Sequence, residues 1–301
     1  MSTRRWFDVM IVRPLAMVAV LALPIGACEL AREQEVVGVA AAASRWPHEP
    51  NRFVTLTDQP WDRIVMPTAA SGVARLVAKA HAVLFDAPDQ EGGWRYLRRS
   101  SSKDDEIVAD ATAPASPPGV LRITFTTDMQ RDHEPSVHFV GLPRVAEVYS
   151  GWWMKLSPNW TCSPAGCGKI TFLLPDSANA GVIYSNLAGR DGTHYVNVAT
   201  TWPSTGYKFW PNNVTQTRVD DDRWYRVEWY VKWASAPDVA DGIIRWWVDG
   251  ELNGDHRSVP FPAVPGFLEF QHASTRQNPP PTEQYMYIDH TYVSVPVQQV
   301  K

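Results

Sequence analysis

Residues 220–256 read DDDRWYRVEWYVKWASAPDVADGIIRWWVDGELNGDH and contain two strand patterns separated by a loop. In 225–233 every second side chain is apolar or aromatic, and the positions between them hold Arg226, Glu228, Tyr230 and Lys232. This alternation indicates a strand with one buried side and one solvent-facing side. The second pattern, 243–248, is rich in β-branched and aromatic residues and runs into Asp249 and Gly250, a typical hairpin turn. The stretch therefore predicts antiparallel sheet whose apolar face needs a second sheet to cover it.

The composition of the whole chain favours the same architecture. Its 301 residues include 14 Trp, and its 25 Pro outnumber its 18 Gly, so that short apolar runs are interrupted at frequent intervals. The formal net charge is −4 and the pI is about 6.1, which gives no basic surface for nucleic acid. We expect an all-β fold, an antiparallel two-sheet jelly-roll sandwich, in a single domain over 51–297.

The N-terminus has the pattern of a targeting segment. Arg4, Arg5 and Arg13 precede a short apolar run over 15–23, and Ile-Gly-Ala-Cys follows, ending at Cys28. These residues predict a lipoprotein signal peptide with a lipobox over 1–28, lipidation of Cys28 and a tether over 29–50. The alternative is an ordinary signal peptide with an incidental cysteine. The lipoprotein reading implies a bacterial cell envelope, at the outer membrane or cell surface, with a lipid anchor in the membrane.

The other two cysteines lie close together in TCSPAGCGK, at Cys162 and Cys167. In an exported protein this spacing predicts a disulfide that closes a short loop. A metal site is disfavoured, because two thiolates are too few ligands and no histidine lies close by in sequence. The acidic run 220–222 leaves calcium open as a cofactor, although a turn before a strand is the commoner reading.

Several stretches resemble the concanavalin A-like jelly roll of bacterial polysaccharide lyases, in their heparin-lyase-like and alginate-lyase-like forms. They are DATAPASPPGVLRITF at 110–125, GWWMKLSPNW at 151–160, KITFLL at 169–174, the 224–252 region and YIDHTYVSV at 287–295. The resemblance implies the fold and leaves the activity open, because lectins and glucanases share it. A glycoside hydrolase with two catalytic carboxylates is not expected, since Glu-x-Asp-x-x-Glu is absent. The strand motifs of alginate lyases are also absent, and GFLEFQHA at 266–273 offers no tyrosine to match theirs.

A polysaccharide lyase needs a base for the proton next to a uronate carboxylate, an acid for the leaving oxygen, and a cation or amide for the carboxylate. His272 is our candidate for the base, and Tyr285 or Tyr287 for the acid. Each also has a structural reading. A histidine in the middle of a strand is commonly a core residue with a satisfied hydrogen bond, and the tyrosines could pack at a strand edge.

A second group of residues could hold carbohydrate. Cations and a histidine on strands or turns could bind a sugar carboxylate or hydroxyl, and Trp side chains in the loop-like stretch 201–213 could stack on sugar rings. The candidates are Lys169, Arg190, His194, Trp202, Trp210 and Arg226. The alternatives are a solvated sheet face with cross-strand ion pairs and packing under long loops.

Three functions remain open from the sequence. The first is an exported, surface-anchored jelly roll that recognises extracellular polysaccharide through a concave groove. An alternative is a polysaccharide lyase that cleaves a uronate polymer by β-elimination, and a second alternative is a structural or adhesive surface lipoprotein without a sugar site. The alternation of side chains identifies two faces for each strand, but it does not say which sheet is concave.

Overall fold

The computed structural model describes residues 46–59, 73–77, 82–86, 94–99, 105–129, 136–162, 167–175, 181–190, 193–202, 206–237, 239–262 and 266–297. They belong to the compact unit Ala43–Lys301. Every regular element among them is a β-strand. Within these ranges no helix could span a membrane. The expected signal peptide, Cys28 and tether residues 29–45 lie outside the described residues, and they stay predictions.

One layer of the fold is an eight-stranded sheet, here called sheet A. Its strands are β1 (Phe53–Gln59), β5 (Asp105–Ala109), β6 (Gly119–Phe125), β8 (Glu147–Leu156), β13 (Tyr225–Lys232), β14 (Gly242–Val248), β15 (Glu251–Val259) and β17 (Gln284–Pro296). The strand order is β15-β14-β13-β8-β17-β6-β5. The long strand β17 pairs with β6 along its first half and with β1 along its second half.

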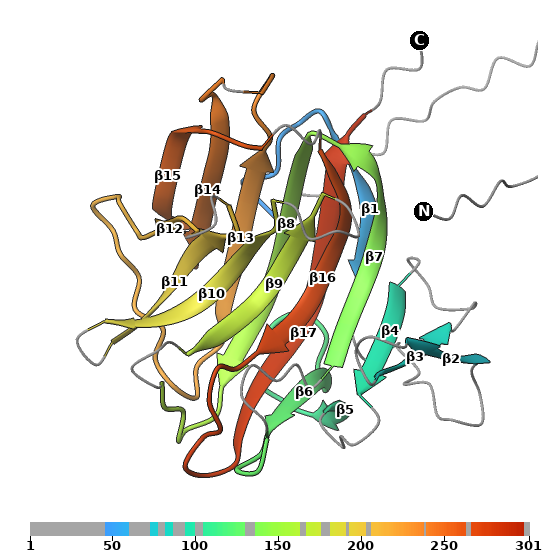
Figure 1. The fold of residues 1–301 in the computed structure, drawn as a ribbon. Helices are drawn as coiled ribbons and strands as arrows, with labels where there is room; N and C mark the ends of the chain where they lie inside the picture. The colour runs from blue at the N-terminus through green and yellow to red at the C-terminus, as the bar shows by residue number, and fades with distance from the viewer. Residues whose placement is uncertain are drawn as a thin grey trace, which may run out of the picture. The chain divides into compact units, whose positions relative to one another are not determined.

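The other layer is a nine-stranded sheet, here called sheet B (Figure 1). Its strands are β2 (Val73–Val77), β3 (Ala82–Asp86), β4 (Trp94–Arg99), β7 (Ser136–Val145), β9 (Gly168–Leu174), β10 (Ile183–Arg190), β11 (Thr193–Thr200), β12 (Lys208–Phe209) and β16 (Phe267–Thr275). The order is β12-β11-β10-β9-β16-β7-β4-β3-β2. Pairing is antiparallel throughout both sheets, which confirms the predicted two-sheet jelly-roll sandwich.

The alternation in 225–233 decides which side of sheet A faces the core. Trp229 is fully buried and packs between the sheets together with Trp152 and Trp246, opposite Phe267 and Phe270 of sheet B. The turn after β14 also forms as predicted. Asp249 and Gly250 both have positive φ, at 52° and 87°, which the tight link between β14 and β15 requires.

Residues 46–50, here called the strap, lie on the outward face of sheet A. The Trp46 ring stacks on Tyr292 with centroids 5.7 Å apart, and the His48 ring stacks on Trp247 at 4.6 Å. Trp46 is only 2% exposed. The last five residues of the predicted tether, 46–50, therefore pack on sheet A, because its aromatic outward face gives Trp46 apolar surface to cover.

Gly151 of β8 makes room for the strap, because a Cβ at this position would collide with the Trp46 ring. We expect Gly151→Ala to displace the strap and to lower the free energy of unfolding by about 1–3 kcal/mol, the usual cost of overpacking. Limited proteolysis would show faster cleavage near Trp46. Gly141→Ala is the matched control, since a Cβ there meets nothing within 4 Å. Equal protease resistance of the two variants would contradict the contact.

Candidate functional site

His272, the expected base, lies between the two sheets. It is 1% exposed, and its Nε2 lies 2.8 Å from the Oγ1 of Thr291 on β17. Its ring packs edge-on against Trp152, at 5.8 Å between centroids, and against Phe270. Burial, with the nearby His138, lowers the pKa of His272 to about 3. A side chain enclosed in this way has no route to a polymer, so His272 matches the structural reading rather than the catalytic one.

This buried histidine predicts a pH dependence of stability. The pKa of His272 is about 3 in the folded chain and about 6.5 in the unfolded chain. Between these values the unfolded chain binds a proton that the folded chain does not, so the free energy of unfolding falls as the pH falls. As the pH falls from about 7 to about 5, the slope of the free energy of unfolding against pH rises toward ~1.4 kcal/mol per pH unit.

Urea unfolding of the parent and of His272→Gln at these two pH values measures the effect. His194 contributes in the same direction, because burial lowers its pKa also, so His194→Ala is measured beside them. A slope that is unchanged in His272→Gln would contradict the prediction.

Tyr285 and Tyr287, the expected acids, lie on the outward face of sheet A. The guanidinium of Arg122 lies 4.7 Å from the Tyr285 ring centroid, and Nζ of Lys155 lies 5.0 Å from that of Tyr287. The side chains between and after them, Met286 and Ile288, point into the core. His272 therefore lies inside the sandwich while both tyrosines lie outside it, and the structure does not bring the proposed base and acid together.

Arg226 and Trp202 also lie away from a common site. Arg226 is on the outward face of sheet A, where its Nε lies 2.9 Å from Oε1 of the fully buried Glu228. The Trp202 indole donates to the Pro260 carbonyl at 2.9 Å, and its ring packs 5.2 Å from that of Phe261. Both side chains thus have structural partners. Arg226 forms an ion pair with Glu228, and Trp202 packs against the core beside Phe261.

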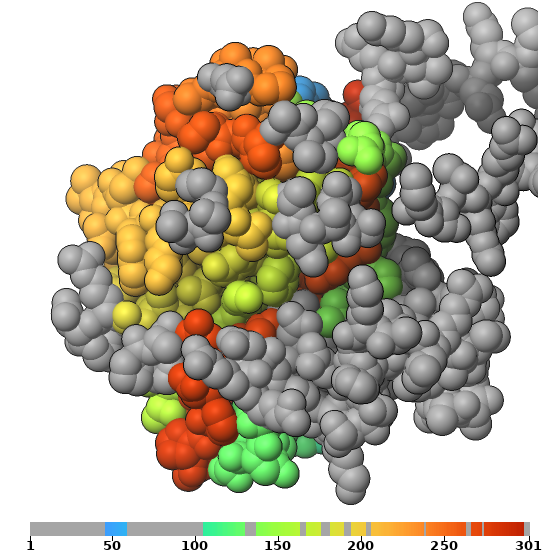
Figure 2. Space-filling model, in the orientation of Figure 1, coloured from blue at the N-terminus to red at the C-terminus, as the bar shows by residue number. Residues whose placement is uncertain are grey.

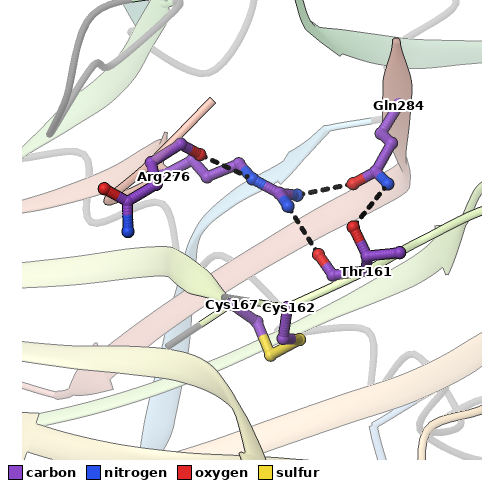
Figure 3. Close-up of a disulfide and its surroundings, with 6 residues drawn as sticks. Thr161, Cys162, Cys167, Arg276 and Gln284 are labelled. Atoms are coloured by element: carbon purple, nitrogen blue, oxygen red, sulfur yellow. Dashed lines mark hydrogen bonds between the residues drawn. A yellow bond between two sulfur atoms is a disulfide. The ribbon is translucent and has the colours of Figure 1, made fainter. Parts of the chain in front are cut away.

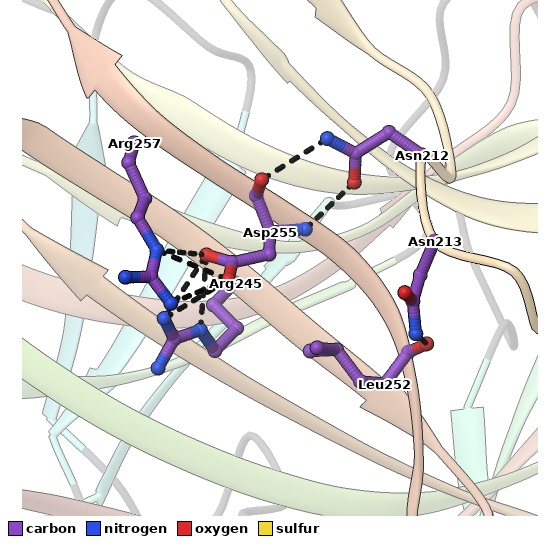
Figure 4. A network of polar contacts seen from close by, with 6 residues as sticks. All are labelled: Asn212, Asn213, Arg245, Leu252, Asp255 and Arg257. Atoms are coloured by element: carbon purple, nitrogen blue, oxygen red, sulfur yellow. Dashed lines mark hydrogen bonds and ion pairs between the residues drawn. The ribbon is translucent and has the colours of Figure 1, made fainter.

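The stretch with Lys208 and Trp210 is attached to strand β15 (Figure 4). Asn212 exchanges two hydrogen bonds with the backbone of Asp255, at 2.8 and 3.0 Å, and the Asn213 amide donates to the Leu252 carbonyl at 2.6 Å. Nε2 of His256 lies 2.9 Å from the carbonyl oxygen of half-buried Trp210. The expected loop of sugar-stacking Trp residues is therefore a connection fastened to the edge of sheet A.

The predicted disulfide between Cys162 and Cys167 is present (Figure 3). Arg276 holds the chain beside it, because the guanidinium donates to the Thr161 carbonyl at 2.5 Å and to the Gln284 side chain at 2.6 Å. His194 of β11 lies close to both sulfur atoms. Arg190 is the last residue of β10, next to the turn that leads to β11.

Lys169 is the predicted residue that the structure places in an open pocket, on the outward face of sheet B. The pocket is lined by Gly168, Lys169, Tyr184, Asn186, Lys208, Thr275 and Gln277. Lys169 of β9 pairs with Asn186 of β10 on one side and with Thr275 of β16 on the other. Lys169, Asn186 and Thr275 thus come from three adjacent strands, and Lys208 of β12 adds to the lining. Strands β9 and β10 lie in the yellow-green to yellow area of Figure 2.

Tyr184 gives the pocket an aromatic wall. Nζ of Lys169 lies 5.0 Å from the centroid of its ring. The tyrosine is half-buried, and this burial raises the pKa of its hydroxyl. The neighbouring residues Ile183 and Leu187 point into the core, so that Tyr184 faces outward with Asn186. Two amines, a neutral phenol and side-chain amides together suit a sugar that carries a carboxylate.

Sequence reasoning missed Tyr184, Asn186, Lys208 and Gln277. The signal in 183–187 is weak, because Ile183 and Leu187 are buried but the buried residue between Tyr184 and Asn186 is the polar Ser185. The sequence pattern instead pointed to Arg190 and His194, on either side of residues 191–192. The run 220–222 gives the calcium reading no geometric support, because the group of potential metal ligands found within the described ranges is Cys162, Cys167 and His194.

The fold is shared with solved structures of polysaccharide lyases. Alginate lyase Aly36B, in a mutant complex with alginate tetrasaccharide, superposes with a TM-score of 0.50 and 14% identity, over 80% of this chain and 96% of that one. An endo-β-1,4-glucuronan lyase from the fungus Trichoderma reesei gives 0.44 and 13%, over 66% and 92%. Alginate lyase vAL-1 from Chlorella virus gives 0.47 and 13%, over 68% and 93%. No protein-family model and no curated protein matches the chain. At 14% identity the likeness to Aly36B supports the jelly-roll fold alone.

Proposed function

We propose that this chain is a polysaccharide lyase that cleaves a uronate polymer by β-elimination in the pocket on the outward face of sheet B. The observation that supports it is the convergence of Lys169, Tyr184, Asn186 and Lys208 from strands β9, β10 and β12 of one sheet. These residue types match the requirements of the reaction, which are a base, an acid and a group that neutralises the uronate carboxylate. Fold likeness to Aly36B agrees with this proposal but supplies no residue for it.

The roles follow from the chemistry of each group. Lys208 and the Asn186 amide bind the carboxylate and stabilise the negative charge that develops on it. Lys169 accepts the C5 proton, the C4–O4 bond breaks, and a C4=C5 double bond forms. The Tyr184 hydroxyl gives its proton to the departing O4. Burial raises the pKa of this hydroxyl, so it carries its proton when the polymer binds.

The lipid anchor at Cys28 and a cell-envelope location belong to the same proposal. An extracellular polymer reaches a catalytic pocket only if the domain lies outside the cytoplasm. The predicted signal peptide over 1–28 would bring it there, and the Cys162–Cys167 disulfide is typical of such compartments.

The test is the ultraviolet absorbance of the unsaturated uronate that elimination produces. The full chain with Cys28→Ser is incubated with alginate, glucuronan, heparin-like and pectic polymers. Absorbance should rise on at least one of them, and Lys169→Ala should abolish the rise. Lys232→Ala on sheet A is the matched control and should keep the activity, since Lys232 is a half-buried strand lysine on the other sheet. No rise on any polymer would overturn the lyase.

A polysaccharide-binding module is the second candidate. It is favoured by one observation, that the lining residues include no histidine or carboxylate among those the structure describes. Retardation of the protein in a gel that contains one of these polymers, without any rise in absorbance, would establish binding in place of cleavage. Retardation should then be lost in Lys169→Ala as well.

A further inference from the structure

Three potential metal ligands meet beside the start of β9. The ligand atoms of Cys162, Cys167 and His194 all lie within 4.8 Å of one another, although His194 is 27 residues from the nearer cysteine in the sequence. The backbone holds them in place. The Cys167 amide donates to the Leu187 carbonyl at 3.2 Å, and His194 pairs with Gly189 across the β10–β11 ladder.

Gly189 lies beside both sulfur atoms. A Cβ at this position would lie 3.6 Å from Cβ of Cys162 and 3.7 Å from Sγ of Cys167. The strand pair that carries His194 is thus in direct contact with the disulfide, and the imidazole needs no rearrangement of the backbone to approach it.

A carboxylate also lies near this group. The Val219 amide donates to the His194 carbonyl at 2.9 Å, and the acidic residues 220 and 221 follow directly in the chain. Charge interactions couple Asp221 and His194.

We propose that Cys162, Cys167 and His194 form a redox-gated site for a thiophilic divalent cation such as Zn²⁺, with Asp221 or water as the fourth ligand. In the oxidised chain the disulfide occupies the sulfur atoms and the site is closed. A dithiol reductant opens it. The reductant gives two electrons and two protons to the disulfide, so the S–S bond breaks and two cysteine thiols form. The reductant itself is oxidised to a cyclic disulfide. The cation then binds the two thiolates as their protons leave.

The separation of the ligand atoms suits this proposal. Zn–S bonds of about 2.3 Å and Zn–N bonds of about 2.0–2.1 Å place tetrahedral ligand atoms roughly 3.5 Å apart. Atoms already within 4.8 Å reach that arrangement through small movements of the side chains. Either state then holds the two cysteines together next to Gly168 and Lys169, which line the candidate pocket.

The experiment uses the full chain with Cys28→Ser, which leaves two cysteines. Zn²⁺ is titrated into oxidised and into reduced protein against a chromogenic chelator, and Co²⁺ replaces it for absorption spectra. We expect one equivalent of metal in the reduced protein, none held stoichiometrically in the oxidised protein, and thiolate-to-metal charge-transfer bands with Co²⁺. Binding that does not depend on reduction, or an absence of binding to the reduced protein, would overturn the site.

The variants identify the histidine. Even outer-shell partners of metal ligands contribute about 10- to 100-fold to affinity, so His194→Ala should weaken Zn²⁺ binding by ~100-fold or more. His48→Ala, on the strap over sheet A, is the matched control and should bind as the parent does. Equal binding by both variants would overturn the role of His194. If His194→Ala does not fold, the Co²⁺ spectrum of the parent decides, because octahedral bands without thiolate charge transfer would exclude the site.

Discussion

Replacement of Tyr184 by phenylalanine is expected to lower the turnover of the uronate polymer by about 10²- to 10⁴-fold, the usual contribution of a general acid. The ring that forms the pocket wall remains, together with its contact to Lys169. Binding of the polymer should therefore change little, so that kcat falls and KM stays within a few-fold. Initial rates of product absorbance over a range of polymer concentrations measure both constants.

Tyr287→Phe is the matched control. Tyr287 lies on sheet A, and like Tyr184 it is a half-buried strand tyrosine next to a lysine, Lys155. Its turnover should equal that of the parent. If Tyr184→Phe keeps full turnover, Tyr184 is not the acid. If Tyr287→Phe loses it instead, the reaction takes place on sheet A and the pocket of sheet B is the wrong site.

Trp152→Ala is expected to lower the free energy of unfolding by about 3–5 kcal/mol, the range for removal of a large aromatic side chain from a core. Trp152 is completely buried, with its ring edge-on to Trp229 at 6.2 Å and to His272 at 5.8 Å. Truncation leaves a cavity between the sheets beside a histidine that depends on that packing. Chemical denaturation followed by circular dichroism measures the loss, and Trp152→Phe gives a smaller loss if the alanine variant does not fold.

The neighbouring Trp153 provides a control within the same strand. It faces outward, where it is half-buried beneath the Arg226 guanidinium at 5.9 Å. Trp153→Ala should cost about 1 kcal/mol, because its ring is only partly removed from water. Equal losses for the two adjacent substitutions would contradict the assignment of one ring to the core and one to the surface.

The alternation of side chains was enough to predict the sandwich, because burial of one face is a local property of each strand. It placed Trp229 in the core and Glu228 on the outward face correctly. It could not foresee that the strap would cover Glu228, since that contact joins His48 to a residue 180 positions away. Parity also fails along β17, where a register shift between Asp289 and Thr291 accompanies a positive φ at His290.

The candidate site was predicted less well, because it depends on which strands become neighbours. Lys169 was identified from its own strand. Its companions could not be, since the order β10-β9-β16 places Asn186 and Thr275 on either side of it only after folding. His272 was chosen for its residue type, and type alone does not distinguish a side chain at the surface from one turned toward Trp152.

In β10 the residues of the core and the residues of the pocket occupy alternate positions. Ile183 and Leu187 maintain the core, whereas Tyr184 and Asn186 face the pocket, and a change in one set leaves the other in place. Descendants of this chain can therefore exchange these outward residues at small thermodynamic expense while the core positions keep the scaffold unaltered. The same separation lets a fold persist while sequence identity falls as low as the 14% between this chain and alginate lyase Aly36B.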